Sequence, residues 1–185
     1  MAESFIESNK AQPEFSSGAV TKLGLRFGIG VGLVCVGWMI FLHLSGNNAF
    51  GPKQILAQLL VPLAAVASEW MLRRNLKPEK PGLGRALGVG ALTVLVAAVL
   101  SAVGLMGLAG IAGEKAVALN RAEMLEIVRA QHRENAKVKR SEQEMQQQIR
   151  NVENITPGDM ATGNFTQILL LGFALAVPAG IFLRE

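Results

Sequence analysis

Four long apolar stretches alternate with polar connections along this chain, and each stretch predicts a helix that crosses a membrane. They cover residues 23–44, 55–72, 86–112 and 165–185. The third is the most distinctive because it carries no charge and its only polar side chains are Thr93 and Ser101. It exceeds the roughly 20 helical residues that a bilayer core requires. A buried helix of a soluble protein usually has a polar face, and this stretch has none. The pattern therefore predicts an all-α polytopic membrane protein with four spans.

Small residues recur every four positions in these stretches, which places them on one face of a helix. Such faces let two helices approach closely inside a membrane. The glycines from Gly28 to Gly32 have no strand before them, so we do not interpret them as a nucleotide-binding loop. The expected helix-packing residues are Gly24, Gly28, Gly32, Gly84, Gly88, Gly172, Ala176 and Gly180.

The connection from Arg73 to Arg85 holds five basic residues, the densest cluster in any short connection. Short loops rich in Lys and Arg stay in the cytoplasm. We therefore expect both termini on the cytoplasmic side and the connection at 45–53 outside. Residues 1–22 are polar and lack the pattern of a cleaved signal peptide, so we interpret them as a retained cytoplasmic tail. The expected location is a bacterial inner membrane.

Residues 113–164 form a long polar insert between the third and fourth spans, on the outer side in this topology. From residue 114 to residue 152 it is rich in good helix formers and has no Gly or Pro. A straight helix of about 40 residues would be about 60 Å long, too long for the remaining chain to return to its own bundle. Either the helix breaks into a hairpin, for which Gln131–Asn135 is the favoured place, or the last span joins a neighbouring subunit. We favour the hairpin.

Residues able to support catalysis or metal binding are sparse. His43 and His132 have no partner ligands at metal-binding spacing, and Cys35 is the single cysteine. Glu69 is the one acid within reach of a span and a possible intramembrane polar site. Its closeness to Arg73 and Arg74 favours an ion pair at the membrane interface. We expect no catalytic residues, no metal and no cofactor.

Composition agrees with a membrane protein. Half of the residues are hydrophobic and only 17% are charged, against about 25% in typical soluble domains. The net charge of +4 would suggest nucleic acid in a soluble protein. Here basic residues at membrane edges explain it, so we expect no nucleic-acid partner.

The order of these parts resembles a family of small bacterial inner-membrane proteins, domain of unknown function 4199. The likeness rests on the glycine-bearing segment Leu25–Gly32, the entry to the third span at Gly84–Gly88, the polar segment Met124–Gln148 and a last span that ends the chain. It extends over nearly the whole length. The family has no established activity, so the resemblance implies a topology and no chemistry.

Two functions fit the pattern. The first is a non-enzymatic structural, assembly or partner-binding subunit, which contacts the lipid bilayer and uses residues 114–152 to bind another protein or a second copy of itself. The alternative is a small transporter or channel subunit, which would need polar groups facing the bundle interior. Thr93, Ser101, Gln58 and Glu69 are a thin supply for that purpose. A membrane enzyme is a third class, but no acid and base can be placed together.

Overall fold

The computed structural model describes residues 15–78, 80–134 and 142–184, and their regular structure is helical throughout. Four of the helical segments are long and apolar enough to cross a membrane. This confirms the all-α prediction and the number of apolar helices. The elements are α1 (Phe15–Leu44), the short 3-10 helix η2 (Pro52–Gln54), α2 (Ile55–Gln58), α3 (Leu60–Leu76), α4 (Gly82–Glu134), α5 (Glu142–Glu153) and α6 (Pro157–Leu183).

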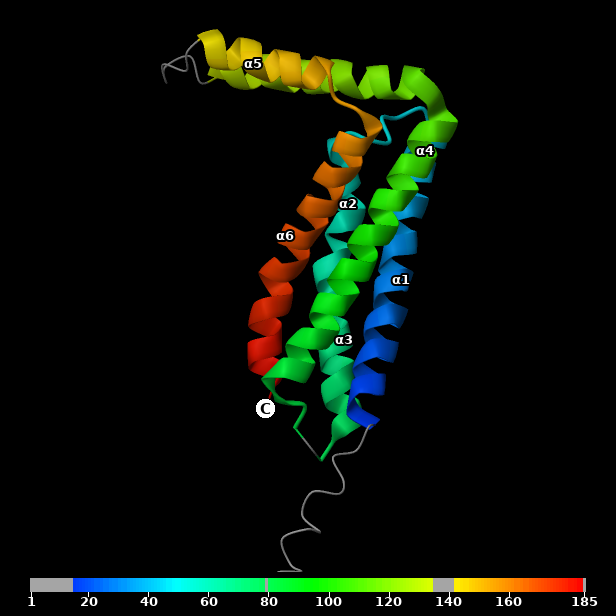
Figure 1. Ribbon diagram of the computed structural model, residues 1–185, viewed down its shortest axis with the longest axis vertical. Helices are drawn as coiled ribbons and strands as arrows, with labels where there is room; N and C mark the ends of the chain where they lie inside the picture. Colours follow the sequence, from blue (N-terminus) through cyan, green and yellow to red (C-terminus); the bar gives the residue numbers. More distant parts are fainter. Residues whose placement is uncertain (1–14, 79, 135–141, 185) are drawn as a thin grey trace, which may run out of the picture.

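The long helices lie side by side as one bundle, and α4 packs against α1, α3 and α6 (Figure 1). The helix α6 also packs against α3, so the last apolar helix returns to the bundle that α4 leaves. The basic connection after α3 lies at the end of the bundle where α6 finishes (Figure 1).

Three of the long helices begin earlier than the apolar stretches that predicted them. The helix α1 begins at Phe15, within the expected tail, α4 begins at Gly82, within the basic connection, and α6 begins at Pro157, within the expected insert. A reciprocal cap starts α6: the Asp159 amide donates to the Thr156 hydroxyl, and the Asp159 carboxylate accepts from the Thr156 amide. The apolar pattern marks where a helix meets hydrocarbon, whereas capping groups mark where it starts.

The second span is interrupted, since α2 ends at Gln58 and α3 starts at Leu60. Proline has no N–H group, so Pro62 leaves the carbonyl of Gln58, four residues earlier, without a helical donor. The interruption therefore lies before the ring of the proline, where the helical hydrogen bond is missing.

The helix α4 bends sharply at Gly113, whose φ of 71° and ψ of −176° are not helical. This conformation is essentially restricted to glycine. Beyond it, residues 114–134 cross the end of the bundle, and α5 lies alongside them (Figure 1). We call residues 114–134 together with α5 the arm. The sequence favoured a break in the helix at Gln131–Asn135. The chain is helical through Glu134, and Asn135 lies outside the described residues.

The distribution of apolar side chains is the reverse of that in a soluble bundle. Large apolar groups cover the outer surface of the helices, among them Leu33, Val103 and Leu170, which are 58%, 62% and 70% exposed. Thr93, Ser101 and Glu69 are buried inside. Monomeric soluble proteins rarely expose such a continuous apolar surface. The fold is that of a helical membrane protein.

Most of the expected packing residues lie at close helix crossings. A Cβ atom on Gly24, Gly28 or Gly32 would press on Leu92, Val96 or Leu100 of α4. On α6, Gly172 faces Val94, Gly180 faces Leu87, and Ala176 is buried between them. Two positions differ. A Cβ on Gly84 would meet nothing within 4 Å, and one on Gly88 would have ordinary contact with Val20.

Replacing Gly28 by alanine should lower the stability of the bundle. Its Cβ would lie 2.7 Å from the Val96 Cβ and 2.8 Å from the Thr93 carbonyl oxygen, so α1 and α4 must separate. Overpacking of this kind typically costs about 1–3 kcal/mol. Thermal unfolding in mild detergent should show the loss.

Gly30→Ala is the matched control, because a Cβ at Gly30 on the same helix meets nothing within 4 Å. Alanine favours helices over glycine, so this control should be neutral or slightly stabilising. Equal melting temperatures for the two variants would contradict the close α1–α4 contact.

Candidate functional site

Buried polar side chains gather at three levels along α4, which we call the outer, middle and inner levels. They are marked by Asn120, Ser101 and Thr93, each at most 1% exposed. The outer level lies where the arm meets the bundle, and the inner level lies toward the basic connection. Each level recruits polar groups from other helices.

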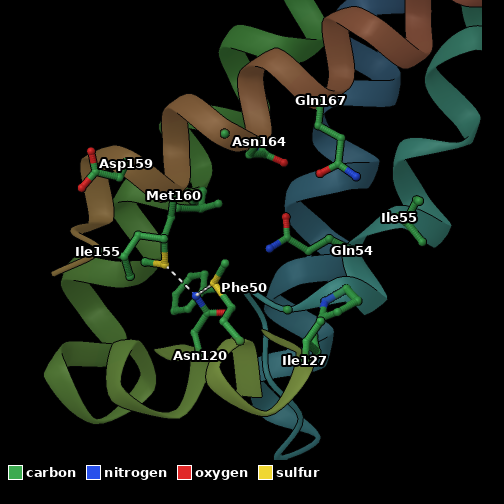
Figure 2. Close-up of a pocket in the computed structure, with 15 residues that line it drawn as sticks. Phe50, Gln54, Ile55, Asn120, Ile127, Ile155, Asp159, Met160, Asn164 and Gln167 are labelled. Carbon is green, nitrogen blue, oxygen red and sulfur yellow. Dashed lines mark hydrogen bonds between the residues drawn. The ribbon is translucent and has the colours of Figure 1, made fainter. Parts of the chain in front are cut away.

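At the outer level, the arm is hydrogen-bonded to the connection between α1 and η2. The Asn48 amide donates to the Asn120 side-chain oxygen at 3.1 Å and to the Glu123 carboxylate at 2.5 Å. The Asn120 amide in turn lies 3.1 Å from the Met160 sulfur on α6 (Figure 2). These contacts join three separate parts of the chain around one buried amide.

Arg121 fixes the segment that enters α6. Its Nε and Nη2 groups donate to the Ile155 carbonyl oxygen at 3.1 and 2.8 Å, and its Nη1 group pairs with Glu114. Two N–H donors on one carbonyl restrict the direction of the chain. The angle between the arm and the bundle is therefore held by side chains as well as by Gly113.

A pocket of about 270 Å³ lies between the arm and the bundle (Figure 2). Ile127 and Asn120 reach it from the arm, whereas Asn164 and Gln167 reach it from α6 (Figure 2). Its walls are mainly apolar with several amide side chains. The carboxylate of Asp159 also lines it, but that group caps α6 through Thr156. The pocket could hold a small uncharged group and offers no nucleophile beside a base.

At the middle level, a chain of hydrogen bonds links three helices. The Gln58 amide of α2 donates to the Asn164 oxygen at 2.7 Å, and the Asn164 amide donates to the Ser101 hydroxyl at 2.8 Å. The Gln58 oxygen accepts no hydrogen bond from the described residues. The connection from α2 through α6 to α4 fixes the register of these helices.

At the inner level, Thr93 lies 3.0 Å from the Ser68 hydroxyl and 2.9 Å from the Val89 carbonyl. The next residue on α3, Glu69, is fully buried, and neither carboxyl oxygen has a hydrogen-bond partner among the described residues. Gly90 provides the space, since a Cβ there would overlap the Glu69 carboxyl group.

The position of Glu69 corrects the expected interfacial ion pair. The helix α3 continues to Leu76, so Glu69 lies well inside it and faces the bundle. Arg74 instead lies over the ring of Trp70 on the exposed side, 5.8 Å from its centre. The expectation failed because it relied on closeness in sequence, whereas α3 turns Glu69 toward Gly90 of α4 and Arg74 toward the exposed side.

The other candidate side chains lie apart. His43 is at the end of α1, and His132 is on the arm beside Met145. Cys35 is buried in the bundle core. Within the part of the chain that the structure describes, no three His, Cys, Asp or Glu side chains converge to hold a metal ion.

Comparison with known proteins gives one match. Residues 26–185 match the family described as Protein of unknown function (DUF4199). The chain belongs to this family. The match confirms the resemblance seen in the sequence. No curated protein and no solved structure matches the chain. The DUF4199 description carries no activity with it, and the four apolar helices are what indicate a membrane protein.

Replacing Asn164 by alanine should destabilise this DUF4199 protein by about 1–3 kcal/mol, the usual cost of leaving buried partners unpaired. The Gln58 amide would lose its acceptor and the Ser101 hydroxyl its donor. Ser101→Ala, which removes only the end of the chain of bonds, should cost less. Thermal unfolding in detergent measures both. An Asn164→Ala protein as stable as the original would contradict the middle-level network.

Proposed function

We propose that this protein is a non-enzymatic subunit of a bacterial inner membrane that binds another protein through its arm. In this proposal residues 114–152 lie outside the cytoplasm and both termini lie in it. The bundle serves as a membrane anchor that presents the arm at a set angle.

The main support for the proposal is the way in which the arm is turned and held against the bundle. Gly113 turns it away from the bundle axis, and the contacts of Asn120 and Arg121 hold that turn. A connection that only joined two spans would need a few residues. A long helical pair held in a defined direction is typical of a segment that other molecules contact.

The surface of the arm suits a polar protein partner. A groove between its two helices is lined by groups of both charges together with apolar Ile127 and Met145. Its charged members are Glu123, Glu126, Arg129 and Arg133. Mixed charge with interspersed apolar groups fits a partner of complementary polar surface better than the single-sign surface of a nucleic acid.

Charge at the ends of the helices supports the orientation. Arg73, Arg85 and Arg184 lie at the end of the bundle opposite the arm, together with Lys22 and Arg26 near the start of α1. Lys and Arg near the ends of spans favour the cytoplasmic side. The end of the bundle next to the arm has Lys53 in the short connection between α1 and α2.

Single-cysteine labelling should place the arm and the basic connection on opposite sides of the membrane. Cys35 is first replaced by alanine, because it is the only cysteine. A cysteine at Glu144 should then react with a membrane-impermeant maleimide from outside intact cells, whereas one at Lys80 should react only after the membrane is opened. Labelling of both from the same side would contradict the orientation.

Removing the outer part of the arm should abolish partner binding while leaving the bundle folded. Residues 127–148 can be replaced by a short Gly-Ser link because the two arm helices lie side by side (Figure 1). This variant keeps Arg121, Glu123 and Val152, which secure the arm to the bundle. We expect proteins that co-purify with the intact chain in mild detergent to be lost, or the oligomer to dissociate if the partner is a second copy.

The matched control is Leu170→Ala on the exposed surface of α6, which should retain the same partners. An arm deletion that keeps its melting temperature, its oligomeric state and all co-purifying proteins would contradict the proposal.

A transporter or channel subunit is the second candidate, and the buried polar levels favour it. The inner and middle levels are separated by close-packed apolar residues, namely Val61, Ala65, Ala97 and Ala98, all of which are fully buried. A transport path would have to open this layer. Solute or ion flux in reconstituted vesicles that is lost in Asn164→Leu would favour transport over partner binding.

A further inference from the structure

Glu69 differs from the other buried polar groups at the inner level because its carboxyl group has no hydrogen-bond partner in the part of the chain that the structure describes. Ser68 and Thr93 have partners in their own helices, the carbonyls of Ala65 and Val89. Glu69 is fully buried, and both of its carboxyl oxygens are without a hydrogen-bond partner among the described residues. An acid kept in a membrane span without a structural bond is a candidate for ligand binding.

The bundle is shaped around this carboxyl group. Gly90 of α4 faces it, and any larger residue there would displace it. On either side of Gly90, Leu87 and Val94 pack against Gly180 and Gly172 of α6. The absence of a side chain at Gly90 therefore leaves space for the acid between helices that are otherwise in close contact.

No described cation neutralises the carboxyl group. The described basic groups at this end of the bundle are Arg73 and Arg74 on α3, Lys77 and Lys80 in the connection that follows, Lys22 and Arg26 on α1, Arg85 on α4 and Arg184 on α6. Among described residues the ion pair formed is that of Arg121 with Glu114, far from this level. An unpaired carboxylate in a low-dielectric interior is strongly unfavourable, so the group must gain a positive partner.

We propose that Glu69 is a reversible proton-binding site, held as a neutral carboxylic acid within the bundle. A proton is the ligand that fits, because it neutralises the charge and needs no added coordination shell. A metal cation would require several oxygen ligands around it. The other side-chain oxygens of the inner level are the hydroxyls of Ser68 and Thr93, and both are engaged with other groups.

Fully buried apolar residues lie on both sides of Glu69. Toward the arm these include Val61 and Ala65 of α3, and toward the basic end they include Leu72 of α3 and Val89 of α4. Exchange of the proton therefore requires the helices to open. The basic end offers the short route, because α3 ends about 10 Å from Glu69 along the helix axis.

Infrared spectroscopy of the full chain in liposomes tests the proposal. Protonated carboxylic acids have a carbonyl-stretch band that carboxylates and amides lack. We expect this band in the original protein and not in Glu69→Gln. It should shift after transfer to heavy water and decrease as the pH is raised.

Glu123→Gln is the matched control, since Glu123 lies on the arm, where it accepts a hydrogen bond from Asn48, and its replacement should leave the Glu69 band in place. Retention of the band in Glu69→Gln, or its absence from the original protein, would overturn the proposal. A band insensitive to heavy water would show that the proton does not exchange and would also overturn it. Loss of the band on adding Na⁺ at constant pH would assign a metal cation in place of the proton.

A second measurement needs no variant and covers the case in which Glu69→Gln does not fold. A hydrophobic carbodiimide reacts with protonated carboxyl groups within membranes, and peptide mapping locates the adduct. We expect the adduct on Glu69, with a yield that falls as pH rises and is unaffected by Na⁺. An unreactive Glu69 together with a missing infrared band in the original protein would overturn the assignment.

Discussion

The structure depends on one constraint, which is that hydrocarbon and not water surrounds the four long helices. Apolar residues such as Leu33, Val103 and Leu170 gain nothing by leaving lipid for the bundle interior, so they remain on its surface. The helices must associate by close packing and internal hydrogen bonds. This explains why glycine and alanine occupy the crossings with α4, and why Ser101 and Asn164 are buried and hydrogen-bonded between helices.

The same constraint explains the position of the bend. At Gly113 the chain leaves the apolar segment of α4, and residues beyond it can be polar on every side. Asn120, Asn48 and Met160 meet at this boundary, and Arg121 holds the return of the chain into α6. The pocket of Figure 2 lies at this junction, where apolar walls from the bundle meet amide groups. The direction of the arm and the start of the last helix are therefore set by one group of contacts.

Apolar patterning was sufficient to predict the helical class, the four long apolar helices and the small-residue faces at Gly28 and Gly172. These features repeat at helical spacing and depend on local sequence alone. The burial of Glu69 could not be predicted, because it depends on the end of α3 at Leu76 and on the gap at Gly90. The partners of Asn164 and Asn120 were also missed, since each lies far away in sequence. An asparagine at the start of an apolar stretch, as at Asn164, was the available signal.

Spin-label accessibility provides the most direct test of the idea that lipid surrounds the bundle. Nitroxides would be placed singly at Leu33, Val103 and Leu170, with a fourth at Glu144 on the arm, in a protein whose Cys35 is replaced and which is reconstituted in liposomes. The three bundle labels should collide mainly with oxygen, which concentrates in hydrocarbon, and the arm label mainly with a water-soluble nickel complex. Bundle labels that collide chiefly with the nickel complex would contradict the account.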